Sequence, residues 1–178
     1  YCQDESVLGA PFYVMDRVSG MILRNRKPKD LALSPELMQG ISKATIDNLV
    51  HLHQIDLHDS GLIDLGKPEG YTKRQVEGWI KRYRNAQTDD IANMDALEPW
   101  LRAHMPSESP TSFIHNDYKY DNLVLSPTDP STAVAVLDWE MCTVGCPLMD
   151  LGTSLAYWVD PDDPASMHMM PFGPTALP

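Results

Sequence analysis

The feature that most constrains the fold of this 178-residue chain lies at residues 113–140, where a polar loop separates short apolar runs. The loop leads into Leu-Val-Leu, a Ser-Pro-Thr-Asp-Pro turn follows, and a second run, Ala-Val-Ala-Val-Leu, comes after the turn. Apolar runs of this length between turn residues are typical of short buried strands. We therefore expect two short strands, 112–125 and 133–138, around the polar loop and the turn.

The polar side chains of this stretch include acids and amides at a defined spacing. His115, Asp117 and Asn122 form the pattern H-x-D-x-x-x-x-N, and the second run ends on Asp138 and Glu140. A loop carboxylate can accept a hydrogen bond from an attacking hydroxyl group, whereas an amide oxygen and a second carboxylate can bind the Mg²⁺ that bridges nucleotide phosphates. We predict Asp117 as the catalytic base and Asn122 with Asp138 as metal ligands, and Glu140 is a further acidic candidate for the metal.

Two neighbouring residues complete the predicted site. Lys119, two positions after Asp117, can reach a phosphoryl oxygen and offset charge in the transition state. His115 is expected to brace the loop through hydrogen bonds. Each residue alone would be weak evidence, because a lone histidine is usually a core residue and an aspartate after a strand is often a turn residue. Their order along the chain makes the prediction specific.

The charge of the chain limits its partners. The sequence has 25 acidic and 14 basic residues, for a formal net charge of -11. Nucleic-acid-binding surfaces are basic, and anionic membranes attract basic segments. We therefore expect neither a nucleic acid nor a membrane as a partner. A magnesium nucleotide remains compatible, because the ion supplies positive charge locally.

The three cysteines, Cys2, Cys142 and Cys146, indicate a reducing, intracellular environment, because they are too few for a disulfide framework. The last two have the spacing of half a zinc site, but no second Cys/His pair accompanies them, so we interpret them as buried small hydrophobes. No apolar run is long enough to span a membrane. We expect a cytoplasmic protein. Since the chain opens on Tyr1, we also expect a fragment of a longer one.

Local patterns predict the remaining elements. Residues 1–27 carry a short apolar run between glycines and are expected to be β-structure. Helical spacing of apolar residues predicts helices over three segments: Pro35 to about Ile55 with Ser34 as N-cap, Tyr71 to about Gln87, and Ile91 to His104. A further helix is expected to start with Asp150 as its N-cap.

The faces of these helices carry further expectations. The second helix has a basic face, which we interpret as solvated, although it could attract an anionic substrate. Four apolar residues of the third helix are expected to point inward: Met94, Leu97, Trp100 and Leu101. Histidines near the end of the first helix are interpreted as capping or core residues rather than metal ligands: His51, His53 and His58.

At these residues the chain resembles the aminoglycoside phosphotransferase-like family, which also includes choline kinase-like proteins. Residues 115–122 resemble its catalytic loop, 137–140 its metal-binding motif, and 145–151 the turn and aspartate that follow. Residues 13–20 resemble the strand and hinge between lobes. The segments 74–79 and 95–101, together with 137–140, look closest to the branch of kinase-like domains fused to acyl-CoA dehydrogenases.

The resemblance implies an α+β, protein-kinase-like fold, mainly the helical C-terminal lobe with short β-hairpins that carry the catalytic loop. Residues 1–20 would be the end of the N-lobe sheet and the hinge, and 21–178 the C-terminal lobe, with the N-terminal lobe largely missing and the chain truncated at both ends. It further implies that Met15, Asp16 and Val18 face the nucleotide.

The sequence departs from the family pattern at two positions. Asn116 stands where glycine is usual, and Cys146 stands where aspartate is usual. Asn116 could stiffen the loop.

The expected function is ATP- and Mg²⁺-dependent transfer of a γ-phosphoryl group to a hydroxyl group of a small molecule, and the branch favours a hydroxyacyl compound over an aminoglycoside. One alternative is a non-catalytic, pseudokinase-like module that binds a nucleotide or a partner. Another is a metal-dependent hydrolase that uses Asp117, Asp138, Glu140 and Asp150. The isolated 178-residue piece is expected to be inactive.

Overall fold

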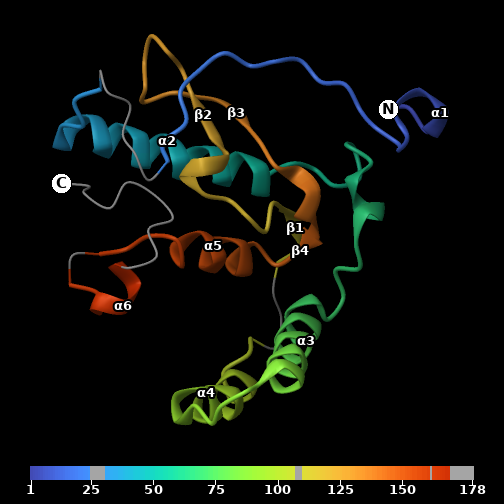
Figure 1. Cartoon of the computed structure of the whole chain (residues 1–178), viewed down its shortest axis with the longest axis vertical. Coiled ribbons are helices and arrows are strands. Elements are labelled where there is room, and N and C mark those ends of the chain that lie inside the picture. Colours follow the sequence, from blue (N-terminus) through green and yellow to red (C-terminus); the bar gives the residue numbers. More distant parts are fainter. Residues whose placement is uncertain (25–30, 107–109, 161, 169–178) are drawn as a thin grey trace.

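The computed structural model describes residues 1–24, 31–106, 110–160 and 162–168, and these residues form an α+β structure (Figure 1). The α-helices are α1 (Glu5–Leu8), α2 (Pro35–His53), α3 (Tyr71–Ala86), α4 (Ala92–Ala103), α5 (Pro147–Leu155) and α6 (Ala165–His168). Short 3₁₀ helices are η1 (Leu62–Leu65), η2 (Tyr120–Asn122) and η3 (Trp139–Met141). No helix among the described residues is long and apolar enough to cross a membrane.

The strands form two small antiparallel sheets in the described part of the chain. In one sheet, β1 (Ser112–Ile114) pairs with β4 (Thr143–Gly145). In the other, β2 (Leu123–Leu125) pairs with β3 (Ala133–Val136). The strand expected over 112–125 is therefore two strands in different sheets, because the polar loop between them leaves the extended conformation. This division places the loop at the junction of both sheets.

The long helix α2 supports the loop and the β2–β3 hairpin. It starts where expected, because the Ser34 side chain accepts a hydrogen bond from the Leu37 amide at 3.2 Å and Pro35 occupies the first turn. Apolar residues of the N-terminal segment, α2, the loop and β2 form the main core: Leu23, Met38, Ile41, Leu49, Tyr118, Tyr120, Leu123 and Leu125. Burial of Tyr118 also brings its hydroxyl group within 2.7 Å of the Thr45 carbonyl oxygen, to which it donates.

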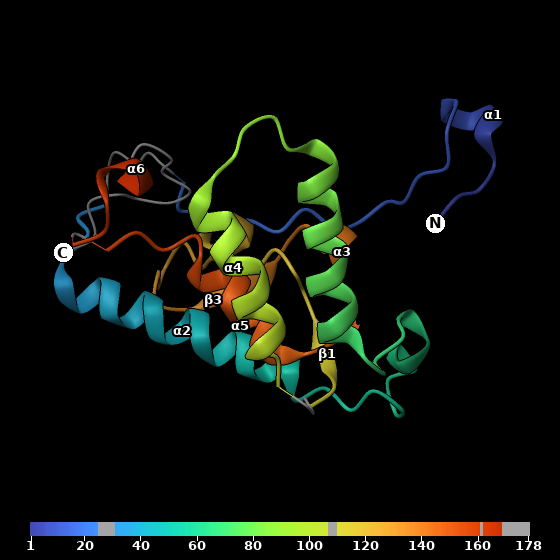
Figure 2. The same cartoon turned by 90° about the horizontal axis from the view of Figure 1, so that it is seen from below.

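The β-structure expected over 1–27 is wrong for the residues that the structure describes there. Residues 1–24 contain the short helix α1 and two isolated bridges, Cys2 to Phe12 and Met21 to Leu125. The part that carries α1 extends away from the rest of the molecule (Figures 1 and 2), whereas Met21 and Leu23 pack against it. Val14 is 84% exposed, and a strand needs a neighbouring strand to satisfy its backbone groups. Residues 25–27 lie outside the described residues.

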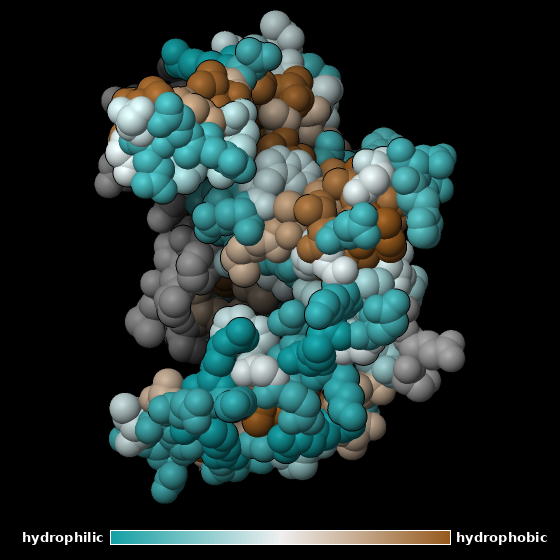
Figure 3. All heavy atoms as spheres, turned by 90° about the vertical axis from the view of Figure 1, so that its right-hand side faces the viewer, coloured by the Kyte–Doolittle hydropathy of each residue, from teal (hydrophilic) through white to brown (hydrophobic). Residues whose placement is uncertain are grey.

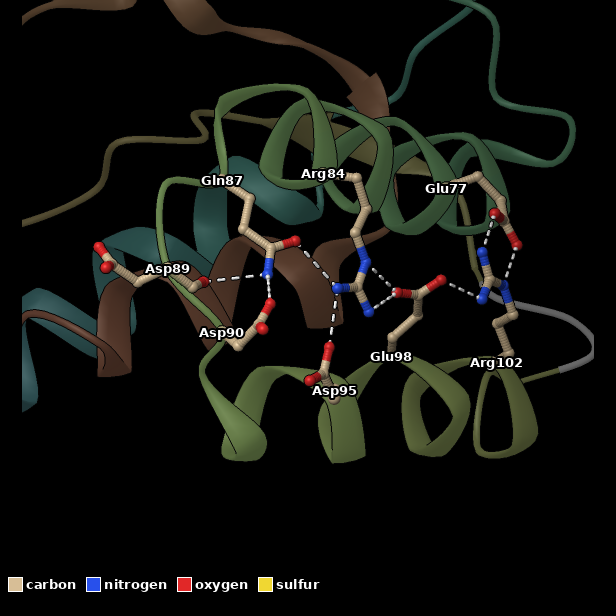
Figure 4. Close-up of polar contacts among 8 residues, drawn as sticks. All are labelled: Glu77, Arg84, Gln87, Asp89, Asp90, Asp95, Glu98 and Arg102. Carbon is tan, nitrogen blue, oxygen red and sulfur yellow. Dashed lines mark hydrogen bonds and ion pairs between the residues drawn. The ribbon is translucent and has the colours of Figure 1, made fainter.

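Helices α3 and α4 form a pair at one end of the molecule (Figures 1 and 2). Their bounds agree with the sequence within a few residues. The four residues of α4 expected to point inward do not all do so, since Leu97 is 40% and Trp100 is 54% exposed. The reason is that α4 packs on α3 along one side only. Ion pairs join the two helices along this side: Arg84 with Asp95 and Glu98, and Arg102 with Glu77 and Glu98 (Figure 4).

Helix α5 also differs from expectation at its start. Cys146 occupies the N-cap position and Pro147 begins the helix, because proline fits the first turn. Asp150 therefore lies inside α5 rather than at its cap, and its side chain points into the protein.

Candidate functional site

The loop after β1 is anchored by the buried carboxylate of Asp150, which is 0% exposed. Its Oδ2 atom accepts hydrogen bonds from the His115 backbone amide at 3.0 Å and from His53 Nε2 at 2.9 Å. Its Oδ1 atom accepts from the Asn116 amide at 2.7 Å. A buried polar group is costly unless it is hydrogen-bonded in this way. Asp150 thus fixes the start of the loop and joins it to the end of α2.

His115 braces the loop from beneath. Its Nδ1 atom accepts a hydrogen bond from the Asp117 amide at 3.2 Å, and its Nε2 atom donates to the Leu137 carbonyl oxygen at 2.9 Å. These two bonds require a neutral ring with its proton on Nε2. The side chain is 0% exposed, so it links the loop to the segment before Asp138. These are contacts of the kind expected of a bracing residue.

Asn116 adopts the left-handed backbone conformation, with φ of 65°. Asparagine tolerates this conformation better than most residues, which explains how it can replace the usual glycine. Its side chain accepts a hydrogen bond from the Tyr71 hydroxyl group at 3.2 Å and donates one to the Met141 carbonyl oxygen at 2.9 Å. Asn116 therefore ties the loop to the start of α3 and to η3, as a stiffening residue would.

Asp117 lies at the centre of a converging set of donors. Its Oδ1 atom accepts hydrogen bonds from the Tyr157 hydroxyl group at 2.7 Å and from Lys119 Nζ at 2.9 Å. Its Oδ2 atom accepts from Lys119 Nζ at 2.7 Å and from Asn122 Nδ2 at 3.1 Å. The Lys119 ammonium group also lies 4.9 Å from the centre of the Tyr157 ring. The structure thus brings together Asp117, Lys119 and Asn122, as the sequence predicts.

These contacts set the protonation states at the site. Burial opposes ionisation of Asp117, but hydrogen bonds from Lys119, Tyr157 and Asn122 outweigh it, so the pKa of Asp117 lies below its ordinary value. Burial and the hydrogen bond to Asp117 raise the pKa of Tyr157 to about 12. At neutral pH Asp117 is therefore an ionised hydrogen-bond acceptor and Tyr157 a protonated donor.

The predicted metal ligands offer oxygen atoms without partners. Asn122 directs its Nδ2 atom to the Asp117 carbonyl oxygen at 2.8 Å, and this contact fixes the orientation of its amide. Asp138 is exposed and has a left-handed backbone conformation, with φ of 67°. Among the described residues, neither Asn122 Oδ1 nor the carboxylates of Asp138 and Glu140 accept a hydrogen bond. The described residues contain no group of three or more His, Cys, Asp or Glu side chains that could hold a metal alone.

A cleft of about 870 Å³ opens beside Asp117. Residues of the loop, of α5 and of the turn after α5 line one part of it: Asn116, Asp117, Met149, Thr153 and Tyr157. The other side is formed largely by α3 and the segment before it, and it carries three cationic side chains: Lys67, Arg74 and Arg82. Arg74 donates to the Lys67 and Glu69 carbonyl oxygens, and Arg82 lies 4.8 Å above the Trp79 ring. None of these three cations pairs with a carboxylate among the described residues.

The residues expected to face a nucleotide lie on the exposed N-terminal segment. Met15 is 60% and Val18 is 41% exposed, and Asp16 is also exposed. The structure does not bring these residues to Asp117, so their contact with a nucleotide stays a prediction.

Sequence reasoning missed Tyr157 and underestimated Asp150. Tyr157 follows the end of α5, 40 residues after Asp117, and no local pattern links the two. Asp150 was part of the recognised pattern, but the sequence does not show that it receives the loop amides. His53, expected to be a capping or core residue, has a core role as the partner of Asp150.

Comparisons with known proteins show which family the chain resembles. A family model described as "Phosphotransferase enzyme family" matches residues 1–170. Acyl-CoA dehydrogenase family member 11 of Homo sapiens is 40% identical over 152 residues, which cover 85% of this chain and 19% of that protein. Acyl-CoA dehydrogenase family member 10 of Mus musculus is 38% identical over 159 residues, which cover 89% of this chain and 15% of that protein.

A solved structure extends the comparison to three dimensions. A proposed aminoglycoside phosphotransferase from Ralstonia eutropha has a TM-score of 0.80 and 39% identity, with 90% of this chain and 49% of that chain covered. This likeness supports the expected kinase-like fold. The chain spans about half of that structure and less than a fifth of the two dehydrogenase relatives. The division into parts of two lobes at residue 20 stays a prediction.

Proposed function

Because the chain belongs to the phosphotransferase enzyme family, as its catalytic-loop motif predicts, we propose that it forms part of an ATP- and Mg²⁺-dependent small-molecule kinase. The enzyme transfers the γ-phosphoryl group to a hydroxyl group of its acceptor. The observation that carries this proposal is the Asp117 carboxylate, ionised beside an open cleft and held by Lys119, Asn122 and Tyr157.

Asp117 orients the acceptor. Its carboxylate accepts a hydrogen bond from the acceptor hydroxyl group, whose oxygen forms a bond to the γ-phosphorus while the bond to the β-phosphate oxygen breaks and ADP leaves. The hydroxyl proton passes to Asp117. Because the lowered pKa makes Asp117 a weak base, its main contribution is orientation, with proton transfer late in the step. Lys119 offsets negative charge on the transferred group.

The residues present fit a magnesium ion. Asn122 and Asp138 offer hard oxygen atoms that have no other partner among the described residues, and Glu140 lies two positions further on. Magnesium is usually bound by one or two protein carboxylates, with water and substrate phosphates as its remaining ligands, so a set of few protein donors suits it. When bound, the ion neutralises charge on the nucleotide phosphates. Asn122 and Asp138 would hold it, with Glu140 as a further candidate.

The charge of the cleft favours an anionic acceptor. Lys67, Arg74 and Arg82 line the cleft without carboxylate partners among the described residues, although the whole chain has a net charge of -11. These side chains would repel a cationic aminoglycoside. They would attract an acceptor that carries a carboxylate or a phosphate group. A hydroxyacyl compound with an anionic group is therefore the acceptor class that we propose.

The full-length protein with an Asp117→Asn substitution tests the catalytic assignment. We expect phosphoryl transfer from ATP to hydroxylated carboxylic acids to fall by about 10²–10⁴-fold, because the acceptor hydroxyl group loses its anionic partner. Asp64→Asn, an exposed residue of η1, is the matched control and should retain activity. Thermal unfolding checks that both variants fold. Unchanged transfer by the Asp117→Asn variant would refute the role of this residue.

The same assay separates the alternatives. A hydrolase releases free phosphate without an acceptor, and a non-catalytic module binds the magnesium nucleotide without any turnover. Either result with the wild-type protein would contradict the proposed kinase.

A further inference from the structure

An apolar groove lies between α3 and α4. Its volume is about 630 Å³, within the range of pockets that hold small molecules. Most of its lining is apolar, and six aliphatic residues contribute from the two helices: Val76, Ile80, Ala86, Met94, Leu97 and Leu101. The outer face at this end of the molecule is mainly hydrophilic, with a small apolar patch (Figure 3). Six apolar side chains of this helix pair therefore line one shared groove.

Ion pairs hold the groove along one edge. Arg84 pairs with Asp95 and Glu98, and Arg102 pairs with Glu77 and Glu98 (Figure 4). These contacts join α3 and α4 along that edge without using the apolar residues. An exposed apolar groove with a polar rim is typical of a binding site. The groove is therefore a candidate site for an apolar ligand group.

The groove adjoins the cleft that contains Asp117. Trp79, Arg82 and Met149 line both cavities. Arg82 lies over the Trp79 ring, so a cationic group marks the boundary between the apolar groove and the polar cleft. A ligand that extends across this boundary meets Asp117 and cations at one end and aliphatic side chains at the other.

We propose that the α3–α4 groove binds the apolar chain of the phosphoryl acceptor, whose hydroxyl group lies at Asp117 and whose anionic group lies among the cations of the cleft. This inference rests on the proposed function for the identity of the ligand. The groove then determines which chain lengths the enzyme accepts, and Leu97 and Leu101 are specificity-determining residues.

Binding of compounds that cannot react tests the groove alone. Butyrate, hexanoate, octanoate and decanoate are titrated into the full-length protein and followed by calorimetry. We expect Kd to fall by up to about fourfold for each CH₂ group that enters the groove. In the Leu97→Asn variant, Kd should fall by only about twofold or less for each CH₂ group, because the polar side chain disrupts the apolar lining. Leu148→Asn is the matched control, since Leu148 is 61% exposed on α5 and lines neither cavity.

A second arm uses hydroxylated carboxylic acids of the same lengths as acceptors with ATP. A rise of kcat/KM with chain length that Leu97→Asn abolishes and Leu148→Asn preserves supports the proposal. Transfer without dependence on chain length would overturn the groove assignment and leave the proposed function standing. Binding that depends on chain length but yields no transfer would support the groove and contradict the proposed function.

Two further results would overturn the groove assignment. The first is a Kd of the wild-type protein that does not depend on chain length, or an equal loss in both variants. The second is sedimentation of the wild-type protein as an oligomer that Leu97→Asn dissociates, because the groove would then be covered by a second copy of the chain.

Discussion

At the scale of single residues, Asp117 depends on a donor that is distant in sequence. Tyr157 donates a hydrogen bond to its Oδ1 atom at 2.7 Å, and Lys119 contacts both carboxylate oxygens. These donors lower the pKa of Asp117 against the opposing effect of burial. Ionisation of Asp117 therefore stabilises the folded state at neutral pH, and this contribution is lost as pH falls through the lowered pKa.

Replacement of Tyr157 by phenylalanine should shift the pH dependence of the reaction. The variant removes one hydrogen bond to the ionised carboxylate, so the pKa of Asp117 rises. We expect the acid limb of the profile of kcat/KM against pH to move to higher pH. Since the pKa of Tyr157 is raised to about 12, loss of its own proton does not affect the neutral range.

Tyr13→Phe is the control for this experiment, because Tyr13 is 71% exposed on the N-terminal segment. A purely structural role for Tyr157 would lower activity at all pH values without moving the acid limb. If the midpoint of the acid limb of kcat/KM against pH is unchanged in the Tyr157→Phe variant, the proposed effect on Asp117 is contradicted.

At the scale of secondary-structure elements, the site depends on one carboxylate that joins three of them. Asp150 lies in α5, receives two backbone amides of the loop after β1, and binds His53 at the end of α2. Buried donors that lose their acceptor cannot turn to water. The positions of α2, α5 and the loop are therefore coupled through a single side chain.

Asp150→Ala should destabilise the fold by about 3–5 kcal/mol, because it leaves buried donors unpaired. His53→Ala should cost less, about 2 kcal/mol, since Asp150 would keep both loop amides. Urea denaturation of the two variants measures both free energies of unfolding. An equal cost for the two substitutions would mean that the loop amides contribute little to the anchoring.

Helices α2, α3 and α4 could be predicted within a few residues because their signals are local. Apolar spacing and the Ser34 cap act within one turn of the chain. The conformation of the N-terminal segment could not be predicted in this way. An apolar run such as residues 11–15 becomes a strand only beside a partner strand. In the described structure the backbone of the N-terminal segment forms only two isolated bridges, Cys2–Phe12 and Met21–Leu125.

For the candidate site, the catalytic-loop pattern located Asp117, Lys119 and Asn122 because their spacing is short. Tyr157 could not be found in this way, because folding alone brings it to Asp117 from 40 residues away. Asp150 was recognised, but its assignment as a helix cap was wrong because Pro147 begins α5 one turn earlier. Long-range contacts therefore account for what the sequence could not show.

At the scale of the whole molecule, the chain matches about half of a solved relative, with 49% of that structure covered. Its N-terminal segment exposes apolar side chains, with Val14 84% exposed. We expect residues 1–178 expressed alone to show no transfer from ATP, whereas the full-length protein is active. The assay of transfer to hydroxylated acids measures both, and circular dichroism checks that the shorter chain is folded. Turnover by the isolated chain would contradict this expectation.

The ion pairs between α3 and α4 have a consequence for how this protein can diverge. Residues that bind the two helices to each other, such as Arg84 and Glu98, are separate from those that anchor the catalytic loop, such as Asp150. Substitutions in the lining between the helices can therefore accumulate without disturbing the loop. Under the proposed function, related proteins could therefore differ in the acceptors that they bind while they keep the same loop and the same reaction.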